Sequence, residues 1–149
     1  MPFLTVPLND AGPLIDVGFA LSSYRIDVMK QAGMADMIYR EPVWVTALID
    51  TGSNISVINR HVIETLSLSS TGNVNVRSAV SGMNSELRDT YDVCLAFAKP
   101  RITPMHANLR VVEGSFFGKS FEAIIGRDIL CKCLFFYDGP DQKFSLSFF

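Results

Sequence analysis

The chain has 149 residues, which suits one domain with a single hydrophobic core. Thirteen Lys and Arg against fifteen Asp and Glu give a net charge of −2, which excludes the strong basic excess typical of nucleic-acid-binding proteins. An apolar content of 48% argues against disorder, yet no uncharged apolar run reaches the roughly 18 residues that a membrane helix needs. We therefore expect a folded domain with neither nucleic acid nor membrane as a partner.

Short strands separated by turn signals are expected along most of the chain. The first two strands flank a turn cluster at residues 9–13, Asn-Asp-Ala-Gly-Pro. In the last strand Phe144, Leu146 and Phe148 alternate with serines, a pattern typical of a half-buried strand. The pattern predicts an all-β fold. The expected strands are residues 3–6, 14–21, 43–49, 74–80, 87–97, 105–112, 134–137 and 144–149.

Up to three short helices interrupt this pattern. The first is expected to begin after Ser22 or Ser23, to run to Gln31 and to stop at Gly33, because serine caps helix starts and glycine ends helices. Two more are expected at residues 59–66 and 128–133, which begin with Asn and Asp. Residues 22–42 therefore form an insertion of unassigned role between two strands.

Targeting and metal-binding signals are weak. The first eight residues are apolar but lack Lys and Arg and are too short for a signal peptide, so a cytoplasmic protein is expected. Cys131 and Cys133 are spaced as in no common zinc or redox motif, and Cys94 is the third cysteine. We expect reduced, mostly buried cysteines, surface or boundary positions for His61 and His106, and neither a metal nor another cofactor.

One short motif could carry chemistry. Asp50, Thr51, Gly52 and Ser53 follow the apolar strand at 43–49, which places a carboxylate at the end of a buried strand. Gly52 lets backbone N–H groups approach the carboxylate, and the two neighbouring side chains supply hydroxyl groups. An aspartate that simply caps a turn has the same letters. The surrounding sequence has to decide between these readings.

Two segments around this motif resemble the signatures of retropepsin-like aspartic proteases. Residues 47–58, Ala-Leu-Ile-Asp-Thr-Gly-Ser-Asn-Ile-Ser-Val-Ile, and residues 123–130, Ala-Ile-Ile-Gly-Arg-Asp-Ile-Leu, occur in the family's order. Between them, residues 74–80 and 86–97 resemble the family's flap hairpin, with Gly82 at its tip. The resemblance covers about residues 43–149. It implies a single domain over residues 1–149, a closed β-barrel with a flap hairpin, and an obligate dimer.

The single Asp-Thr-Gly motif requires two copies of the chain. Peptide hydrolysis by paired carboxylates needs one to accept a proton from water and another to donate one, so one Asp cannot suffice. The resemblance implies that Asp50 of two copies forms the catalytic dyad, that Thr51 hydrogen-bonds across the twofold axis, and that Gly52 allows close backbone approach. We expect the terminal strand at residues 144–149 to form the homodimer interface.

The substrate of such an enzyme is a peptide or protein. The resemblance implies that the flap closes over an extended peptide, whose backbone pairs with it as a strand would. Val80, Ser81, Gly82 and Met83 belong to the expected flap, and Val80, Met83 and Ile124 are expected to line pockets for apolar side chains.

Two positions depart from the usual family pattern. Asn54 stands where retropepsins often have an Asp that pairs with the Arg of the second motif, here Arg127, so at best a neutral hydrogen bond is expected. Arg127 itself is expected to be a partly buried anchor under the turn. Ser53 stands where viral members often carry Ala. A Ser53 hydroxyl donated to Asp50 would stabilise the charged carboxylate and place activity on the acid side of neutrality.

Three functions remain open from the sequence. The first is a homodimeric aspartic endopeptidase, which the intact Asp50, Thr51 and Gly52 favour. The second is a dimeric module with the same fold that binds peptides or partners without cleaving them. The third is a monomeric β-barrel domain, in which the terminal strands pair within one subunit and Asp50 has no mate.

Overall fold

The predicted all-β class is confirmed. The computed structural model describes residues 3–38, 41–77, 84–97 and 103–148. Its strands are β1 (Phe3–Pro7), β2 (Leu14–Leu21), β3 (Val43–Ile49), β4 (Val57–Asn59), β5 (Gly72–Val76), β6 (Glu86–Phe97), β7 (Thr103–Gly114), β8 (Ala123–Ile125), β9 (Cys133–Asp138) and β10 (Lys143–Phe148). Its helices are α1 (Ser23–Gln31), the short 3₁₀ helix η1 (Ala35–Met37), α2 (Arg60–Thr65) and α3 (Arg127–Leu130).

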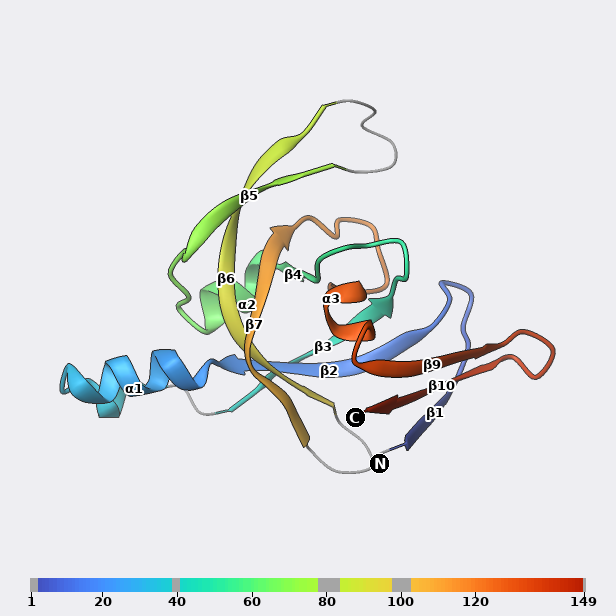
Figure 1. Cartoon of the computed structure of the whole chain (residues 1–149), viewed down its shortest axis with the longest axis horizontal. Helices are drawn as coiled ribbons and strands as arrows, with labels where there is room; N and C mark the ends of the chain where they lie inside the picture. Colours follow the sequence, from blue (N-terminus) through green and yellow to red (C-terminus); the bar gives the residue numbers. More distant parts are fainter. Residues whose placement is uncertain (1–2, 39–40, 78–83, 98–102, 149) are drawn as a thin grey trace.

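A closed β-barrel forms the body of the molecule (Figure 1). The strand order of the main sheet is β2-β3-β8-β4-β7-β6-β5, and β2 also pairs with β6, which closes six of these strands into the barrel. Strand β5 lies outside the closure and pairs with β6 alone in this sheet. Together β5 and the start of β6 form the predicted hairpin, and the expected tip residues Val80, Ser81, Gly82 and Met83 lie outside the described residues.

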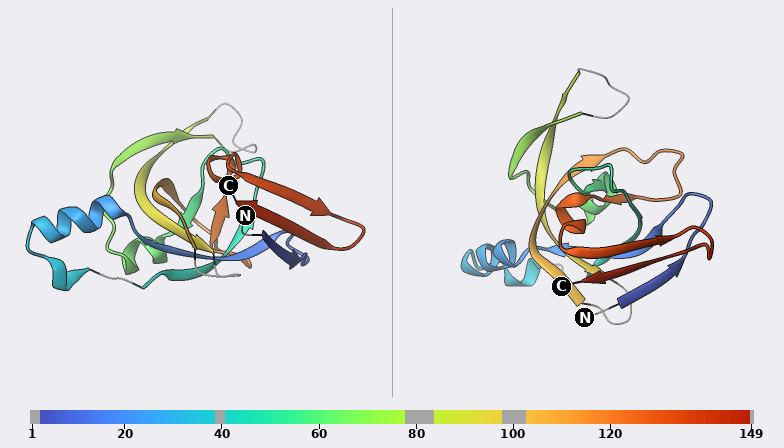
Figure 2. Two further views of the ribbon diagram at one scale, coloured as in Figure 1. Left: turned by 60° about the horizontal axis from the view of Figure 1, so that its bottom comes forward. Right: turned by 45° about the vertical axis from the view of Figure 1, so that its right-hand side comes forward.

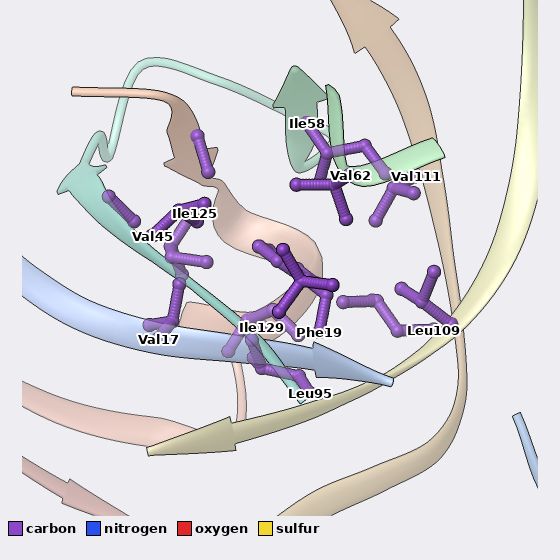
Figure 3. Close-up of a cluster of buried hydrophobic side chains, with 14 of the residues drawn as sticks. Val17, Phe19, Val45, Ile58, Val62, Leu95, Leu109, Val111, Ile125 and Ile129 are labelled. Atoms are coloured by element: carbon purple, nitrogen blue, oxygen red, sulfur yellow. The ribbon is translucent and has the colours of Figure 1, made fainter. Parts of the chain in front are cut away.

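The hydrophobic core fills the barrel. Figure 3 shows side chains from strands on several sides of the barrel, and from two short helices, converging on one interior cluster. Phe19, Leu95, Ile125 and Ile129 are fully buried there. Because Ile125 and Ile129 flank the turn into α3, the core fixes that turn from below, where the second family signature lies.

The two chain termini form a separate three-stranded sheet, in the order β1-β10-β9 (Figure 2). Its inner face carries Phe144 and Leu146, both fully buried, and Phe148, which is 5% exposed. The predicted strand is confirmed, but the expectation that it pairs with a second copy is wrong. Strand β10 is bonded along both edges within its own chain, so its backbone has no free edge to offer a partner.

Helix capping matches the sequence signals. The Ser22 side chain accepts a hydrogen bond from the Arg25 N–H at the start of α1, and Gly33 follows the helix with φ +72°. Asn59 caps α2 in the same way. The third helix is shorter than predicted, because it begins at Arg127 and Cys133 already belongs to β9.

Helix α1 projects away from the barrel, so part of the predicted insertion stands out from the body (Figures 1 and 2). Met29 is the buried side chain of this helix, whereas Tyr24 is 68% exposed. Within the described ranges, no helix has the length and apolar character needed to cross a membrane.

Candidate active site

Asp50 lies directly after β3, at the point where the strand leaves the barrel. Its backbone N–H donates to the Ile125 carbonyl (3.0 Å), so the turn stays attached to β8. Its Oδ1 accepts a hydrogen bond from the Gly52 N–H at 2.8 Å, and the residue is half-buried. A carboxylate held this way has a fixed direction and remains accessible to water, which is what a general acid or base requires.

A side chain would be crowded in the first turn and excluded from the second. A Cβ on Gly52 would lie 3.1 Å from Oδ1 of Asp50, so a side chain there would crowd the atom that accepts the Gly52 N–H. A Cβ on Gly126 would lie 2.9 Å from the backbone carbonyl oxygens of Ser53 and Ile55. Since those neighbours are backbone atoms, they cannot move aside cheaply, and the two turns can approach only without this side chain.

Arg127 joins the second turn to the first. Its backbone N–H donates to the Ser53 carbonyl at 2.8 Å, and its Nη1 donates to the Thr51 carbonyl at 2.7 Å. Arg127 is therefore an anchor of the Asp50 turn, but it is exposed, not partly buried. The expected contact with Asn54 is also not formed within the described part of the chain, because the guanidinium is directed to a backbone carbonyl instead.

The Ser53 hydroxyl does not serve Asp50. Its Oγ donates to the Ile55 carbonyl at 2.7 Å, which uses the only hydroxyl proton. The expectation that this hydroxyl stabilises the charged Asp50 is therefore wrong. Ser53 instead stabilises the loop: its side chain binds the Ile55 carbonyl, and its backbone carbonyl accepts the Arg127 N–H.

A hydrogen-bonded pair that sequence reasoning missed, the buried Ser56 and the half-buried Asp128, connects the two signatures. The Asp128 carboxylate accepts hydrogen bonds from the Ser56 N–H (2.8 Å), the Ser56 Oγ (2.7 Å) and the Ile129 N–H (3.0 Å). Ser56 is fully buried, and its Oγ also accepts from the Gly126 N–H at 3.0 Å. The signal for this pair was present, because both residues lie inside the quoted segments. Nothing local, however, predicts a contact across 72 positions.

Comparison with protein families supports the same reading. The model of the family "Retroviral aspartyl protease" matches residues 22–135. The chain belongs to this family. The match includes Asp50 and the Arg127 turn, so the linked turns described above are those of a retroviral-type aspartyl protease domain.

Solved structures show the same fold at low sequence identity. A retropepsin-like aspartic protease from Rickettsia conorii superposes with a TM-score of 0.57 and 12% identity, over 98% of this chain and 90% of that one. The aspartic proteinase from Irpex lacteus also gives a TM-score of 0.57 and 12% identity, over 99% of this chain but only 47% of that one. Comparison with curated protein sequences gives no match.

In this aspartyl protease domain, Ile124 lies on the same side of the sheet as Asp50. Ile124 pairs with Leu48 on β3 and with Val57 on β4, and its two neighbours on β8 point into the core. Because alternate residues of a strand share a face, Leu48 and Asp50 lie on the side opposite the core. Ile124 lines a cavity there, of about 550 Å³, that the hairpin covers with Val76 and Arg88.

The remaining candidates form no second site. His61 is exposed, and the side chain of His106 lies outside the described ones. In the ranges that the structure describes, no three His, Cys, Asp or Glu side chains cluster closely enough to hold a metal ion. The three cysteines are free thiols, but the expectation that they are mostly buried is wrong, because Cys94 and Cys133 are half-buried and Cys131 is exposed. Partial burial raises the pKa of Cys94 and raises that of Cys133 to about 11.

Proposed function

We propose that this chain is a homodimeric aspartic endopeptidase in which Asp50 of two copies forms the catalytic dyad. The observation that carries the proposal is that hydrogen bonds fix the Asp50 carboxylate and its turn. Asp50 accepts the Gly52 N–H at 2.8 Å, and Arg127 of the second signature fixes the same turn through the Thr51 carbonyl. The chain contains no second Asp-Thr-Gly or Asp-Ser-Gly, so the second carboxylate has to come from another copy.

Each residue of the turn has a role in the proposed reaction. The two Asp50 carboxylates share one proton and bind a water molecule between them. The charged carboxylate takes a proton from the water as it attacks the peptide carbonyl, and the protonated one donates to the carbonyl oxygen. We assign to Thr51, which is exposed beside the carboxylate, a hydrogen bond across the twofold axis.

Two further observations support the dimer. The chain spans about half the length of the Irpex lacteus proteinase that it resembles in fold, as expected if two copies assemble the equivalent of one such protein. The outer face of the terminal sheet also exposes apolar side chains. Phe3 and Leu134 are each 59% exposed and Phe136 is 60% exposed, and the register of β1, β10 and β9 places all three on one face.

The interface that we propose is therefore this outer sheet face (Phe3, Leu134 and Phe136). Apolar side chains that are more than half exposed in one chain gain free energy when a second chain buries them. The pairing of the terminal strands within one subunit is what a monomeric domain would also have, so the oligomeric state has to be measured directly.

A matched pair of proteins tests the activity. Wild type and Asp50→Asn are incubated with a diverse peptide library, and the products are identified by mass spectrometry. We expect cleavage by wild type alone, because Asn cannot accept the proton. Equal cleavage by both proteins would reject the assignment. Cleavage by neither, with peptides still bound, would instead support a non-catalytic binding module with this fold.

A further inference from the structure

The cavity beneath the hairpin includes Ile124, which lies on the same side of the sheet as Asp50. We define the hairpin cavity, of about 550 Å³, by six of its lining residues: Val57, Val76, Arg88, Glu113, Phe116 and Ile124. Strands β4 and β8 form its floor, β5 and β6 its roof, and the end of β7 its back. Ile124 is the cross-strand neighbour of Leu48, two residues before Asp50, so a peptide bound along this side of the sheet can reach both Asp50 and the cavity.

The part of the hairpin cavity nearest Asp50 is apolar. Val57 and Ile124 pair directly across β4 and β8, and Phe116, which packs edge-on against Phe121, also lines the cavity. Such walls accept the methylene groups of a long side chain as readily as a branched apolar one. This part alone does not discriminate between apolar and long charged side chains.

The opposite part of the cavity carries charge, and its arginine is already engaged. Arg88 donates from Nη2 to Glu86 at 2.7 Å and from Nε to the same carboxylate at 3.2 Å. Its Nη1 donates to the backbone carbonyl of Glu113 at 2.8 Å. Arg88 therefore neutralises Glu86 and orients the Glu113 backbone, but it does not pair with the Glu113 carboxylate.

Glu113 carries the charge of this part that has no direct partner. Within the ranges that the structure describes, no side chain forms an ion pair or hydrogen bond with its carboxylate, and it keeps a longer-range attraction to Arg60, whose pKa is raised by Glu64 first and by Glu113 after it. A second cavity of about 670 Å³ shares Glu86, Arg88 and Glu113 and adds Arg60 and Asp89. Arg60 is bound to Glu64 at 2.8 Å, so it is not available to Glu113 as a dedicated partner.

These charges sum to a negative field. The two cavities are lined by two arginines and three carboxylates, which leaves one net negative charge, and Arg60 is further offset by Glu64 outside them. The half-buried position of Glu113 reduces screening by water, so a cation there is attracted more strongly than at an open surface.

We infer that Glu113 selects a basic residue in the peptide: a Lys or Arg side chain enters the hairpin cavity, packs its methylene groups on Val57, Phe116 and Ile124, and pairs its cationic end with the Glu113 carboxylate. This inference rests on the proposed endopeptidase function, because it takes the peptide past Asp50. It assigns a substrate class to the cavity, namely extended peptides with one long basic side chain near the cleaved bond.

The test compares three peptides that differ at one position, which carries Lys, Leu or Glu, within one cleaved sequence taken from the library experiment. We expect kcat/KM for the Lys peptide to exceed that for the Glu peptide by roughly three- to tenfold. This ratio lies between the effect of an exposed ion pair and that of a desolvated one. Glu113→Gln should abolish this ratio, and Glu113→Lys should invert it. Glu122→Gln, which removes an exposed carboxylate outside both cavities, should leave the ratio unchanged.

Failure of this inference is distinguishable from failure of the proposed function. Cleavage with no Lys preference at any position, or with a preference that survives Glu113→Gln, would overturn the role of Glu113 and leave the protease assignment intact. If no peptide is cleaved, we would instead measure the binding of fluorescently labelled peptides, which carry Lys, Leu or Glu at one position of a bound library sequence, to wild type and to Glu113→Gln. Tighter binding of the Lys peptide to wild type alone would support the role of Glu113, and equal binding would overturn it.

Discussion

Ser53 and Ser56 lie in the same turn, yet their hydroxyl groups have different partners. Ser53 Oγ donates to the Ile55 carbonyl, whereas the buried Ser56 Oγ joins the Asp128 carboxylate to the Gly126 N–H. The first braces a half-exposed loop locally. The second holds two distant segments together, and its removal would leave the Gly126 N–H without this acceptor and the Asp128 carboxylate with its two backbone N–H donors alone. Both hydroxyl groups therefore stabilise the segment that follows Asp50, and neither of them contacts Asp50 itself.

The Ser53 hydrogen bond leads to the first prediction. Ser53→Ala should leave both limbs of the pH–rate profile in place, because the hydroxyl does not contact Asp50. Its cost should be limited to about 1 kcal/mol of unfolding free energy. We would measure kcat/KM from about pH 3 to pH 8, together with urea unfolding. Ser56→Ala serves as the matched variant and should cost more stability, about 1 to 3 kcal/mol. A shift of either limb of the pH–rate profile in Ser53→Ala would contradict this prediction and indicate that the hydroxyl does contact Asp50.

The cysteines provide a second test that is independent of activity. Burial, with a smaller contribution from Cys131, raises the pKa of Cys133 to about 11, so Cys133 stays protonated at neutral and mildly alkaline pH. Because the thiolate is the reactive form, a brief iodoacetamide pulse at about pH 8 should label the exposed Cys131 at least about tenfold faster than Cys133. Quenched mass spectrometry measures both. Equal rates in the folded protein would contradict the placement of Cys133.

At the scale of elements, long patterned strands could be predicted and short ones could not. Strands β2 and β3 have the predicted bounds, because alternation and turn signals define both of their ends. Strands β4 and β8 have three residues each, too few for any period to be visible. They are stable because each is paired on both sides, which is a property of the assembled sheet.

The terminal strand shows a different limit of sequence reasoning. The alternation of Phe144, Leu146 and Phe148 with serines predicts a buried face, but it cannot tell which chain covers that face. The structure packs it on the core of the same chain. Ser145 and Ser147 are also buried, on the opposite face, between β1 and β9. The sequence pattern alone thus suggested an intermolecular role for a strand whose contacts are intramolecular.

The assignment of β10 to the core leads to a stability prediction. Leu146→Ala should lower the free energy of unfolding by about 2 to 5 kcal/mol, because it leaves a cavity in a fully buried site. Leu87→Ala is the matched control, since Leu87 is 62% exposed and its truncation should change the unfolding free energy by less than about 0.5 kcal/mol. Urea unfolding monitored by circular dichroism measures both. Similar values for the two variants would contradict the placement of β10.

The outer sheet face leads to a prediction about assembly. Phe136→Asp should weaken the dimer, because a carboxylate would be buried between two apolar surfaces. The monomer fold should persist, since Phe136 is 60% exposed within one chain. Sedimentation velocity over a concentration series gives the dimer dissociation constant. Tyr24→Asp on α1, at a site that is 68% exposed, should leave that constant unchanged. An unaltered dimer in Phe136→Asp would place the interface elsewhere.

At the scale of the whole molecule, the family assignment and the single Asp50 predict how activity depends on the two chains of a dimer. A dimer with one shared catalytic dyad needs an intact Asp50 in both chains, whereas a chain with an independent site would need only its own Asp50. The barrel and the linked turns are complete within one chain. The proposed second carboxylate is not, so activity should depend on how variant and wild-type chains are paired.

Mixing experiments measure this dependence. After equal amounts of wild type and Asp50→Asn are dissociated and reassociated together, random pairing leaves about one quarter of the dimers with two wild-type copies. The mixture should then show about half the activity of the wild-type component alone, because half of its chains are trapped in inactive mixed dimers. Glu41→Gln, which alters an exposed carboxylate instead, should cause no such loss when it is mixed in the same way. Full activity of the wild-type component in the presence of Asp50→Asn would mean that each chain acts without a partner's Asp50, and the shared dyad would be rejected.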